Sequence, residues 1–256
     1  MIDQTYLSDA TFQAALANCR RYWLNFGREL RRDDGISMFR SGVVHPQLNG
    51  VLRLYGADID VLITQAQEQL AGVPCIWWVG PDSRPDALDA LMRHGGAKHG
   101  TIPVYALRLT DLPTGKAKPA GLVIEEVRDD RGLAEWVDCF APSMGVTPDQ
   151  VGKTLQMELD RPDAPGSFRR FAARIGGRMV ATSALLCAEG IAGIYLCSTA
   201  EQHRRKGIAT LMTLHAAWTA VEMGFEVVTL QASPMGQPVY ERIGFKRIAE
   251  YDVVAF

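Results

Sequence analysis

The stretch Gly193–Trp218, GIYLCSTAEQHRRKGIATLMTLHAAW, decides how the rest of the chain is interpreted. It begins with a short apolar run, Ile194–Cys197, which is typical of a buried strand. From Leu211 to Trp218 the apolar residues recur at helical spacing. A polar loop lies between the two and contains the consecutive cations Arg204–Lys206. The pattern therefore predicts a strand, a tight basic loop and a helix.

The basic loop predicts a site for an anion. It ends where the helix would begin, and the unpaired N–H groups and the dipole of a helix N-terminus favour negative charge. Gly207 and Ala209 are small at the point where the backbone would approach the ligand. A P-loop needs GxxxxGK[ST] and a dinucleotide fold needs GxGxxG, and neither pattern is present in this loop. The interpretation is a pyrophosphate cradle; a solvated basic turn before an ordinary helix is the alternative that the loop alone leaves open.

Two motifs in the second half carry a family resemblance. The pattern Arg204-x-x-Gly207-x-Ala209 resembles the Q/R-x-x-G-x-G/A signature of the GNAT superfamily of acyl-CoA-dependent N-acetyltransferases. Further along, Tyr240–Phe245, YERIGF, is similar to the Y-E-K-x-G-F element of that family. The resemblance covers residues 121–256. It implies an α/β GNAT fold, in which a mixed and mostly antiparallel sheet is flanked by helices.

The resemblance also implies the parts of an acetyl-transfer site. Acetyl-CoA would be the acyl donor and no metal would be needed. The loop would hold the pyrophosphate through backbone N–H groups, and the pantetheine arm would pair with the strand before it, which splays from its neighbour in this family. Tyr240 stands where the family places its general acid, although a core tyrosine would fit the same helix. The residues implied to bind the cofactor are Cys197, Ser198, Thr199, Arg204, Arg205, Lys206, Gly207, Ile208, Ala209, Thr210 and Ser233.

Two residues depart from the family pattern, and two functions stay unassigned. Ser233 replaces a frequent Asn, and Gly236 replaces a usual Ala. A general base is not identified: water can deprotonate the amine, and Glu158, Asp160 and Glu189 are candidates by position that also suit a solvated surface. The acceptor wall would include Phe140, Met144 and Phe168, for which simple core packing is the alternative. Cys197 is a poor covalent relay, because it lies on a buried strand without a His at motif spacing.

The first half repeats the element order of the second. Helices are predicted at 11–30, 58–70 and 86–94, with strands at 50–54, 73–80 and 104–109. In the second half, strands are predicted at 123–127, 168–175, 178–188, 227–232 and 250–256, with helices at 131–140, 148–159 and 239–243. Aligning Gly96 with Gly244 places Met92 where Tyr240 stands, and the first half has no R-x-x-G-x-G/A loop. Residues 1–115 are therefore predicted to be a degenerate GNAT-like domain and residues 121–256 the catalytic one. An unrelated α/β extension is the alternative.

The segment between the halves, Asp111–Gly121, has the composition of a linker, since it is rich in Pro, Gly, Lys and Ala. In the first half, the neighbouring Trp77 and Trp78 would point to opposite faces of a strand. One is expected to fill the core and the other an interface.

Composition fits an ordinary globular protein of one large or two small domains. The chain has 256 residues, of which 47% are apolar and 22% charged. Its net charge of -2 argues against a general nucleic-acid-binding surface. No apolar run approaches the about 18 residues of a membrane span, and no secretory signal is visible. The five cysteines lack CxxC spacing and read as reduced thiols of a cytoplasmic protein. The five histidines lack metal-ligand spacing, so no metal site is expected.

The leading hypothesis is therefore an acetyl-CoA-dependent N-acetyltransferase, either a monomer or a homodimer. Its acceptor would be a primary amine of a small molecule or of a peptide N-terminus, and the amine would attack directly. A non-catalytic acyl-CoA-binding sensor or regulatory module is the alternative. Nucleic-acid binding by the loop is disfavoured by the net charge and by the lack of interleaved aromatic residues.

Overall fold

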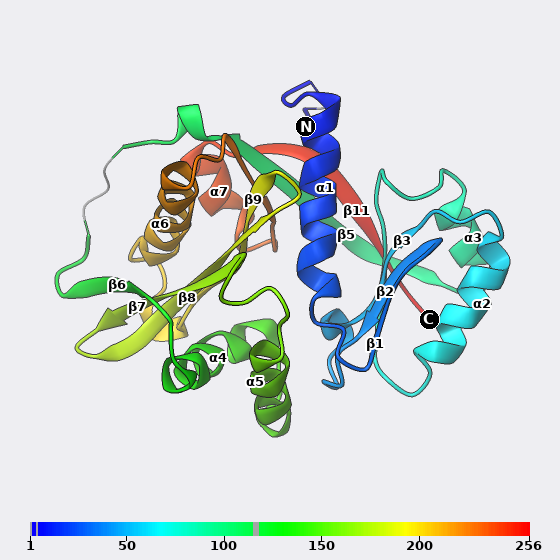
Figure 1. Cartoon of the computed structure of the whole chain (residues 1–256), viewed down its shortest axis with the longest axis horizontal. Coiled ribbons are helices and arrows are strands. Elements are labelled where there is room, and N and C mark those ends of the chain that lie inside the picture. Colours follow the sequence, from blue (N-terminus) through cyan, green and yellow to red (C-terminus); the bar gives the residue numbers. More distant parts are fainter. Residues whose placement is uncertain (1, 4, 115–117) are drawn as a thin grey trace.

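A computed structural model describes residues 2–3, 5–114 and 118–256. Its strands form one sheet across both halves of the chain, in the order β1-β2-β3-β4-β11-β5-β10-β9-β8-β7-β6. Helices cover both faces of this sheet (Figure 1). None of the helices described is long and apolar enough to cross a membrane.

The second half follows the predicted order of strands and helices, and this confirms the GNAT plan. Its elements are β6 (Leu122–Glu126), α4 (Asp130–Met144), α5 (Val151–Leu159), β7 (Phe168–Ile175), β8 (Arg178–Ala188), β9 (Ile191–Thr199), α6 (Ile208–Glu222), β10 (Val227–Gln231), α7 (Gln237–Ile243) and β11 (Lys246–Ala255). Strands β7 and β8 form the predicted hairpin around Gly176 and Gly177, which both adopt the left-handed conformation that such turns need.

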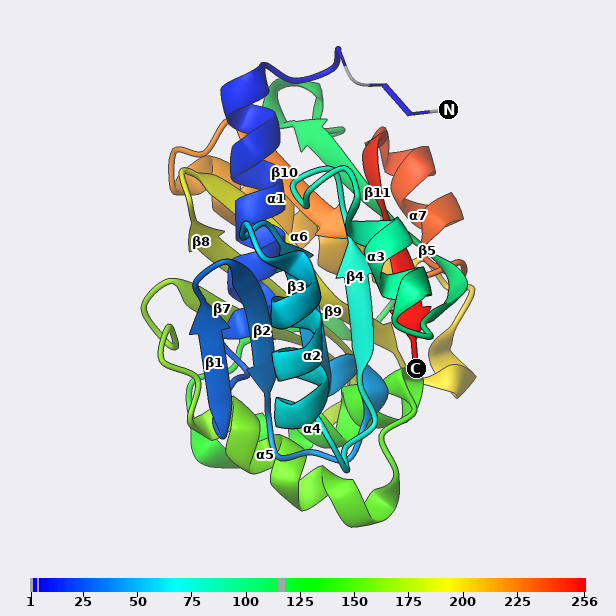
Figure 2. The same ribbon diagram turned by 90° about the vertical axis from the view of Figure 1, so that its right-hand side faces the viewer.

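The first half consists of α1 (Asp9–Leu24), β1 (Leu30–Asp33), β2 (Ile36–Arg40), β3 (Asn49–Leu54), α2 (Ile59–Gln69), β4 (Ile76–Val79), α3 (Ala87–Arg93) and β5 (Ala97–Arg108). Ser8 caps α1 by accepting a hydrogen bond from the N–H of Thr11. The predicted helix at 11–30 is too long: α1 ends at Leu24, and Leu30 begins β1 instead. Figure 2 shows α2 in front of the first-half strands and running along them.

The two halves exchange their last strands. Strand β5, the last of the first half, lies between β10 and β11 of the second half. Strand β11, the last of the second half, lies between β4 and β5 of the first. The two run together through the middle of the molecule (Figure 1). Each half therefore completes the sheet of the other, although the predicted division at residues 115 and 121 stays a prediction. The predicted linker includes residues 115–117, which lie outside the described residues.

Apolar clusters fill both faces of the sheet. On one face, a cluster joins α1 and α4 and contains residues of both halves. On the other face, one cluster lies under α6 and α7 and another under α2 and α3. Trp77 belongs to the α2–α3 cluster and Trp78 to the cluster that both halves share, which confirms that they point to opposite faces.

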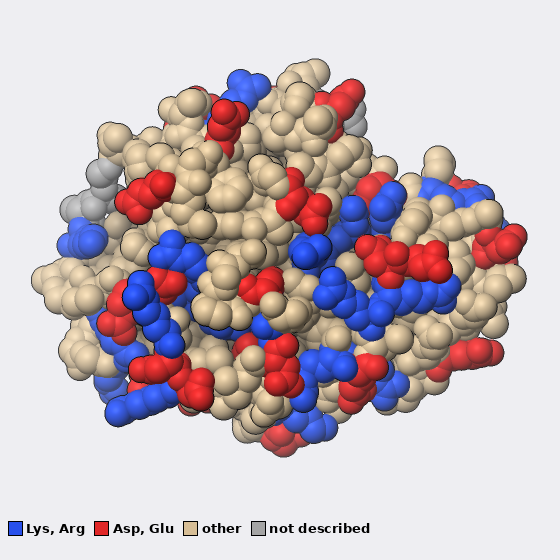
Figure 3. Space-filling view, viewed as in Figure 1, with Lys and Arg blue, Asp and Glu red and all other residues tan. Residues whose placement is uncertain are grey.

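Charge is mixed over the surface. Lys and Arg lie beside Asp and Glu across the face in Figure 3. The ion pairs of the structure include Arg28 with Asp160, at 2.5 Å, and Arg40 with Glu29, at 2.7 Å.

Candidate active site

Strand β9 separates from β10 and leaves backbone groups free. It pairs with β8 over most of its length, but with β10 only at Ala192 and Gly193. Leu196 has a φ of 49°, and the register with β8 shifts between Thr182 and Ala184, which marks a β-bulge. From Ile194 onward, the edge of β9 toward β10 has no strand partner among the described residues.

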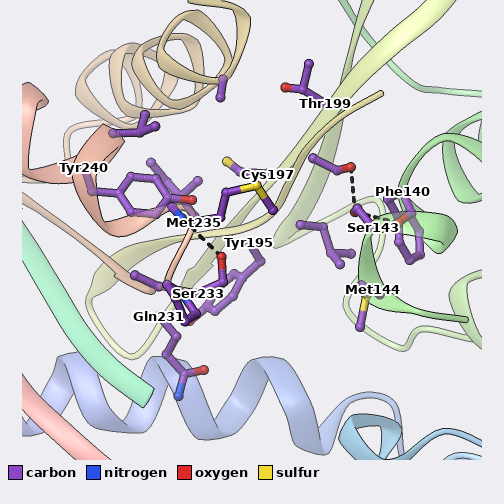
Figure 4. A pocket seen from close by; sticks show the side chains of 18 of the residues that line it. Phe140, Ser143, Met144, Tyr195, Cys197, Thr199, Gln231, Ser233, Met235 and Tyr240 are labelled. Carbon is purple, nitrogen blue, oxygen red and sulfur yellow. Dashed lines mark hydrogen bonds between the residues drawn. The ribbon is translucent and has the colours of Figure 1, made fainter. Parts of the chain in front are cut away.

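A cavity of about 1060 Å³ opens where the strands separate. Figure 4 shows it between β9, α7 and α4, with α1 crossing below. All but one of the residues predicted for the site line it: Cys197, Ser198, Thr199, Arg204, Arg205, Gly207, Ile208, Ala209, Thr210, Ser233 and Tyr240. Lys206 is the exception, because its ammonium turns back and donates to the carbonyl of Gln202 at 3.3 Å.

The start of α6 forms an open cradle for an anion. Gly207 caps the helix with a φ of 76° and no side-chain cap. The first helical hydrogen bond runs from the N–H of Leu211 to the carbonyl of Gly207, so the N–H groups of residues 208–210 have no helical partner. The Arg204 Nε donates to the carbonyl of Thr199 at 3.1 Å and ties the loop to β9. Free amides, a helix dipole and nearby guanidinium groups suit a phosphate.

Tyr240 reaches the cavity from α7. Only 9% of its surface is exposed, and its hydroxyl points toward Cys197 (Figure 4). A Cβ on Gly236 would come within 2.9 Å of the Tyr240 ring, so this position must stay small. Burial raises the pKa of Tyr240 well above 10, and the neighbouring Cys197 raises it further. The phenol therefore keeps its proton at neutral pH and can donate it.

Cys197 stays a neutral thiol. Burial raises its pKa to about 11, while hydrogen bonds with Thr213 and Tyr240 act in the opposite direction. Because the thiolate is the nucleophilic form, this environment is unlike that of a reactive cysteine.

A chain of hydroxyl groups ties α4 to β9 at the cavity wall. Ser143 Oγ donates to the carbonyl of Phe140 at 2.8 Å and lies 2.7 Å from Ser198 Oγ, which then donates to it. Phe140 and Met144 line the cavity, as expected of the acceptor wall. Phe168 does not, and its assignment to that wall is wrong: it is fully buried under the Arg161 guanidinium, whose carbon lies 3.8 Å from the ring centroid.

The three carboxylates considered as general bases lie away from the cavity. Glu158 is buried and paired with Arg170 at 2.7 Å. Asp160 pairs with Arg28, and Glu189 pairs with Arg21 at 3.5 Å. Among the described residues that line the cavity, Glu201 in the loop before α6 is the one that carries a carboxylate.

The sequence did not identify the contribution of the first half to this cavity. Six of its residues line the wall: Tyr22, Trp23, Gln47, Trp78, Thr101 and Ile102. They come from α1, the segment between β2 and β3, β4 and β5. The aromatic residues were visible in the sequence, but the strand exchange that brings them to the second half leaves no local pattern.

Helix α2 occupies in the first half the place that α6 has in the second, but its N-terminus is acidic where that of α6 is preceded by arginines. Acidic Asp58 stands at the N-cap of α2 and Asp60 in its first turn. The Arg84 guanidinium donates to the carbonyls of Gly56 and Ala57 just before this helix. Carbonyl oxygens and carboxylates at this helix start repel a phosphate.

Within the described part of the chain, no group of three or more His, Cys, Asp or Glu residues is arranged to hold a metal ion.

Comparison with known proteins identifies the domain of the second half. The family described as "Acetyltransferase (GNAT) domain" matches residues 153–255. No curated protein matches the chain significantly.

Solved structures that are similar to this chain include proteins described as N-acetyltransferases. A GCN5-related N-acetyltransferase from Kribbella flavida is 17% identical, with a TM-score of 0.70 over 94% of each chain. A tandem GNAT protein from the clavulanic acid biosynthesis pathway is 12% identical, with a TM-score of 0.60 over 96% of this chain and 95% of that one. A GCN5-related N-acetyltransferase from Sphaerobacter thermophilus is 18% identical, with a TM-score of 0.59 over 77% of this chain and 67% of that one. At these identities the likeness establishes the fold alone. Residues 153–255 therefore belong to the GNAT acetyltransferase domain family, and the chain as a whole has the fold of tandem GNAT proteins.

Proposed function

We propose that this protein is an acetyl-CoA-dependent N-acetyltransferase that acts on a primary amine of a small molecule or of a peptide N-terminus. One observation carries the proposal: a single cavity joins the unpaired edge of β9, the uncapped start of α6 and the protonated phenol of Tyr240. These are the parts needed to bind a thioester of coenzyme A and to protonate its leaving group.

Acetyl-CoA would bind along β9 and end at α6. The amides of residues 208–210 would hold the pyrophosphate, and Arg204 and Arg205 would add long-range attraction. The pantetheine arm would pair with the free edge of β9. A backbone N–H among residues 197–199 would then polarise the thioester carbonyl and stabilise the oxyanion.

The acceptor amine would attack the thioester carbonyl carbon directly. A C–N bond forms, the tetrahedral intermediate collapses and the C–S bond breaks. Tyr240 gives its proton to the departing thiolate and regains one from solvent. The proton that the nitrogen loses passes to water, because the three carboxylates considered as bases are paired elsewhere.

A binding module without turnover is the second candidate. It is favoured by one observation: the wall contributed by α1 and α4 offers no carboxylate to accept a proton from the amine. Such a sensor would use the same cradle and the same strand edge.

Two measurements on the whole chain test the proposal. Calorimetry follows the binding of acetyl-CoA, and release of free thiol is followed over a panel of primary amines. Binding with amine-dependent thiol release supports the enzyme. Binding without release on any amine supports the sensor, and absence of binding overturns both.

A further inference from the structure

The cavity has two ends of different chemistry. Every charged side chain of the described lining comes from the loop before α6, residues 200–207, or from α7: Glu201, Arg204, Arg205 and Arg242. The opposite wall comes from the first half and from α4, and none of its residues is charged. In Figure 4, Phe140 and Met144 lie on this side, away from Tyr240, and α1 passes below.

Trp23 is part of this wall, and it contributes an aromatic ring whose polar group is already hydrogen-bonded. The indole Nε1 donates to Gln231 Oε1 at 2.7 Å, so its hydrogen-bonding capacity is used. The ring meets Trp78 edge-to-face, with centroids 4.8 Å apart and planes at 89°. The contact and the hydrogen bond fix the orientation of Trp23 before any ligand enters, and such preorganisation favours a flat apolar group beside it.

A second positive charge on the acceptor would be unfavourable here. The charged residues of the lining all belong to the loop before α6 and to α7, and Arg204 and Arg205 would face the pyrophosphate of the bound donor. The wall of α1 and α4 would bury an ammonium against Trp, Phe and Met without a carboxylate partner, which carries a desolvation cost. The second ammonium group of a polyamine or a polycationic sugar would therefore lose its hydration on this wall and find no carboxylate to pair with.

We propose that the first half builds the acceptor end of the site and selects a monoamine with an aromatic or apolar body and no further positive charge. This inference rests on the acetyltransferase activity proposed above. It assigns Trp23 as a residue that determines specificity. It also assigns Gln47 as an uncharged residue of this wall. The side chain of Gln47 has no hydrogen-bond partner in the described part of the chain.

A matched pair of amines tests the charge rule. 4-Methylbenzylamine and p-xylylenediamine share the ring and one primary amine and differ by a second ammonium group. We expect thiol release to be at least about tenfold more efficient, in kcat/KM, with the monoamine, a ratio that one unpaired charge is large enough to produce. Equal efficiency, or a preference for the diamine or for spermidine, overturns the inference.

A substitution that adds a negative charge tests whether residues of the first half form the acceptor end of the cavity. Gln47→Glu adds a carboxylate of the same shape, and it should raise the relative efficiency of the diamine by about tenfold. Gln13→Glu is the control, since it makes the same change on an exposed part of α1 outside the cavity lining. It should leave the ratio unchanged. If Gln47→Glu also leaves the ratio unchanged while acetyl-CoA still binds, the first half does not form the acceptor end.

Failure of the activity and failure of the inference are distinguishable. If no amine releases thiol, the proposed function fails, and the inference is judged by calorimetry of the two amines on the CoA-saturated protein. Tighter binding of 4-methylbenzylamine, weakened by Trp23→Ala, supports the selective wall. No binding of either amine, or equal binding of both, overturns it.

Discussion

At the scale of single residues, Tyr240 combines a buried ring with a hydroxyl that reaches the cavity. Its neighbour Gly236 leaves room for the ring, and burial keeps the phenol protonated. The residue therefore has the state that an acid needs before the thiolate leaves. A merely structural tyrosine would be equally buried, so the hydroxyl itself has to be tested.

Replacing Tyr240 with Phe removes the acid and keeps the ring. We expect kcat to fall by about 10²- to 10⁴-fold, the usual contribution of a positioned acid, with acetyl-CoA affinity nearly unchanged. Pre-steady-state thiol release and calorimetry measure the two quantities. Tyr251→Phe is the control, because it deletes a fully buried hydroxyl outside the cavity lining. Normal chemistry in the Tyr240 variant would assign that residue to packing.

Asn18 is a second important residue, because its side chain joins α1 of the first half to strands β8 and β9 of the second half. Its fully buried amide lies on α1 and donates to the carbonyls of Leu186, Ala188 and Ile191 at 3.3, 2.9 and 3.2 Å. Its oxygen accepts from the hydroxyl of Tyr195 at 2.7 Å. One side chain of the first half thus provides hydrogen-bond donors for the backbone carbonyls on both sides of the turn between β8 and β9 in the second half.

Truncating Asn18 to Ala should lower the free energy of unfolding by about 2–4 kcal/mol, because several buried polar groups lose their partner at once. Tyr195→Phe, which breaks one of these bonds, should cost about 1 kcal/mol. Urea unfolding of both variants and of the double variant measures these values. Additive effects would contradict the proposed contact, since residues that share a hydrogen bond are expected to be coupled.

At the scale of elements, the loop before α6 and the loop before α2 show what a cofactor site needs. Both precede a helix that packs on its own half of the sheet. The first has free amides and flanking arginines. The second has the carboxylates of Asp58 and Asp60, and the carbonyls just before it already accept hydrogen bonds from Arg84. The same fold element is therefore expected to bind an anion in one half only.

Gly207→Glu should abolish measurable acetyl-CoA binding without unfolding the protein. The new side chain would enter the phosphate cradle, and its charge would repel the ligand. Gly72→Glu is a matched control: its φ of 78° is close to the 76° of Gly207, and nothing lies within 4 Å of an added Cβ. The two variants should therefore lose similar stability from backbone strain. Calorimetry and thermal melting compare them, and undiminished affinity in Gly207→Glu would exclude this loop as the site.

Titration of the whole chain with acetyl-CoA should give one site per chain. The start of α2 carries Asp58 and Asp60, and Met92, half-exposed on α3, cannot donate a proton. Two equal sites in calorimetry would show that the first half retains a cofactor site. The variant Gly207→Glu should reduce the count from one to zero, which identifies the occupied half.

The sequence predicted those elements whose residues alternate or recur regularly. The hairpin of β7 and β8 and the helix α2 follow directly from such patterns. The hairpin of β1 and β2 was missed, because Arg31–Asp33 is charged and short and sits at the sheet edge. Most residues predicted to bind the cofactor line the cavity, since residues 197–210 form one continuous stretch. The acceptor side was not predictable, because α1, β4 and β5 meet α4 only through tertiary packing.

At the scale of the whole molecule, the exchanged strands explain why the two halves form one structure. Strand β5 pairs on one side with β10 over Val227–Gln231 and on the other with β11 over Lys246–Ala255. Without the first half, β10 and β11 of the second half would not be joined, because β5 lies between them. Helix α1 also covers the apolar cluster that Phe140 and Tyr195 share with it.

A chain of residues 121–256 alone should therefore fail to form a stable domain. It would expose the unpaired edges of β10 and β11 and the apolar face that α1 covers, and such edges and faces promote aggregation. We expect it to be largely insoluble and to melt without a cooperative transition. Co-expression with residues 1–114 should restore solubility, because it supplies β5 as the missing strand.

The control is the whole chain with a protease site placed between Thr114 and Lys118, which breaks the same connection after folding. Once cut, it should stay associated in size-exclusion chromatography and bind one acetyl-CoA. A monomeric fragment 121–256 that melts cooperatively and binds acetyl-CoA as the whole chain does would show that the exchanged strand is dispensable.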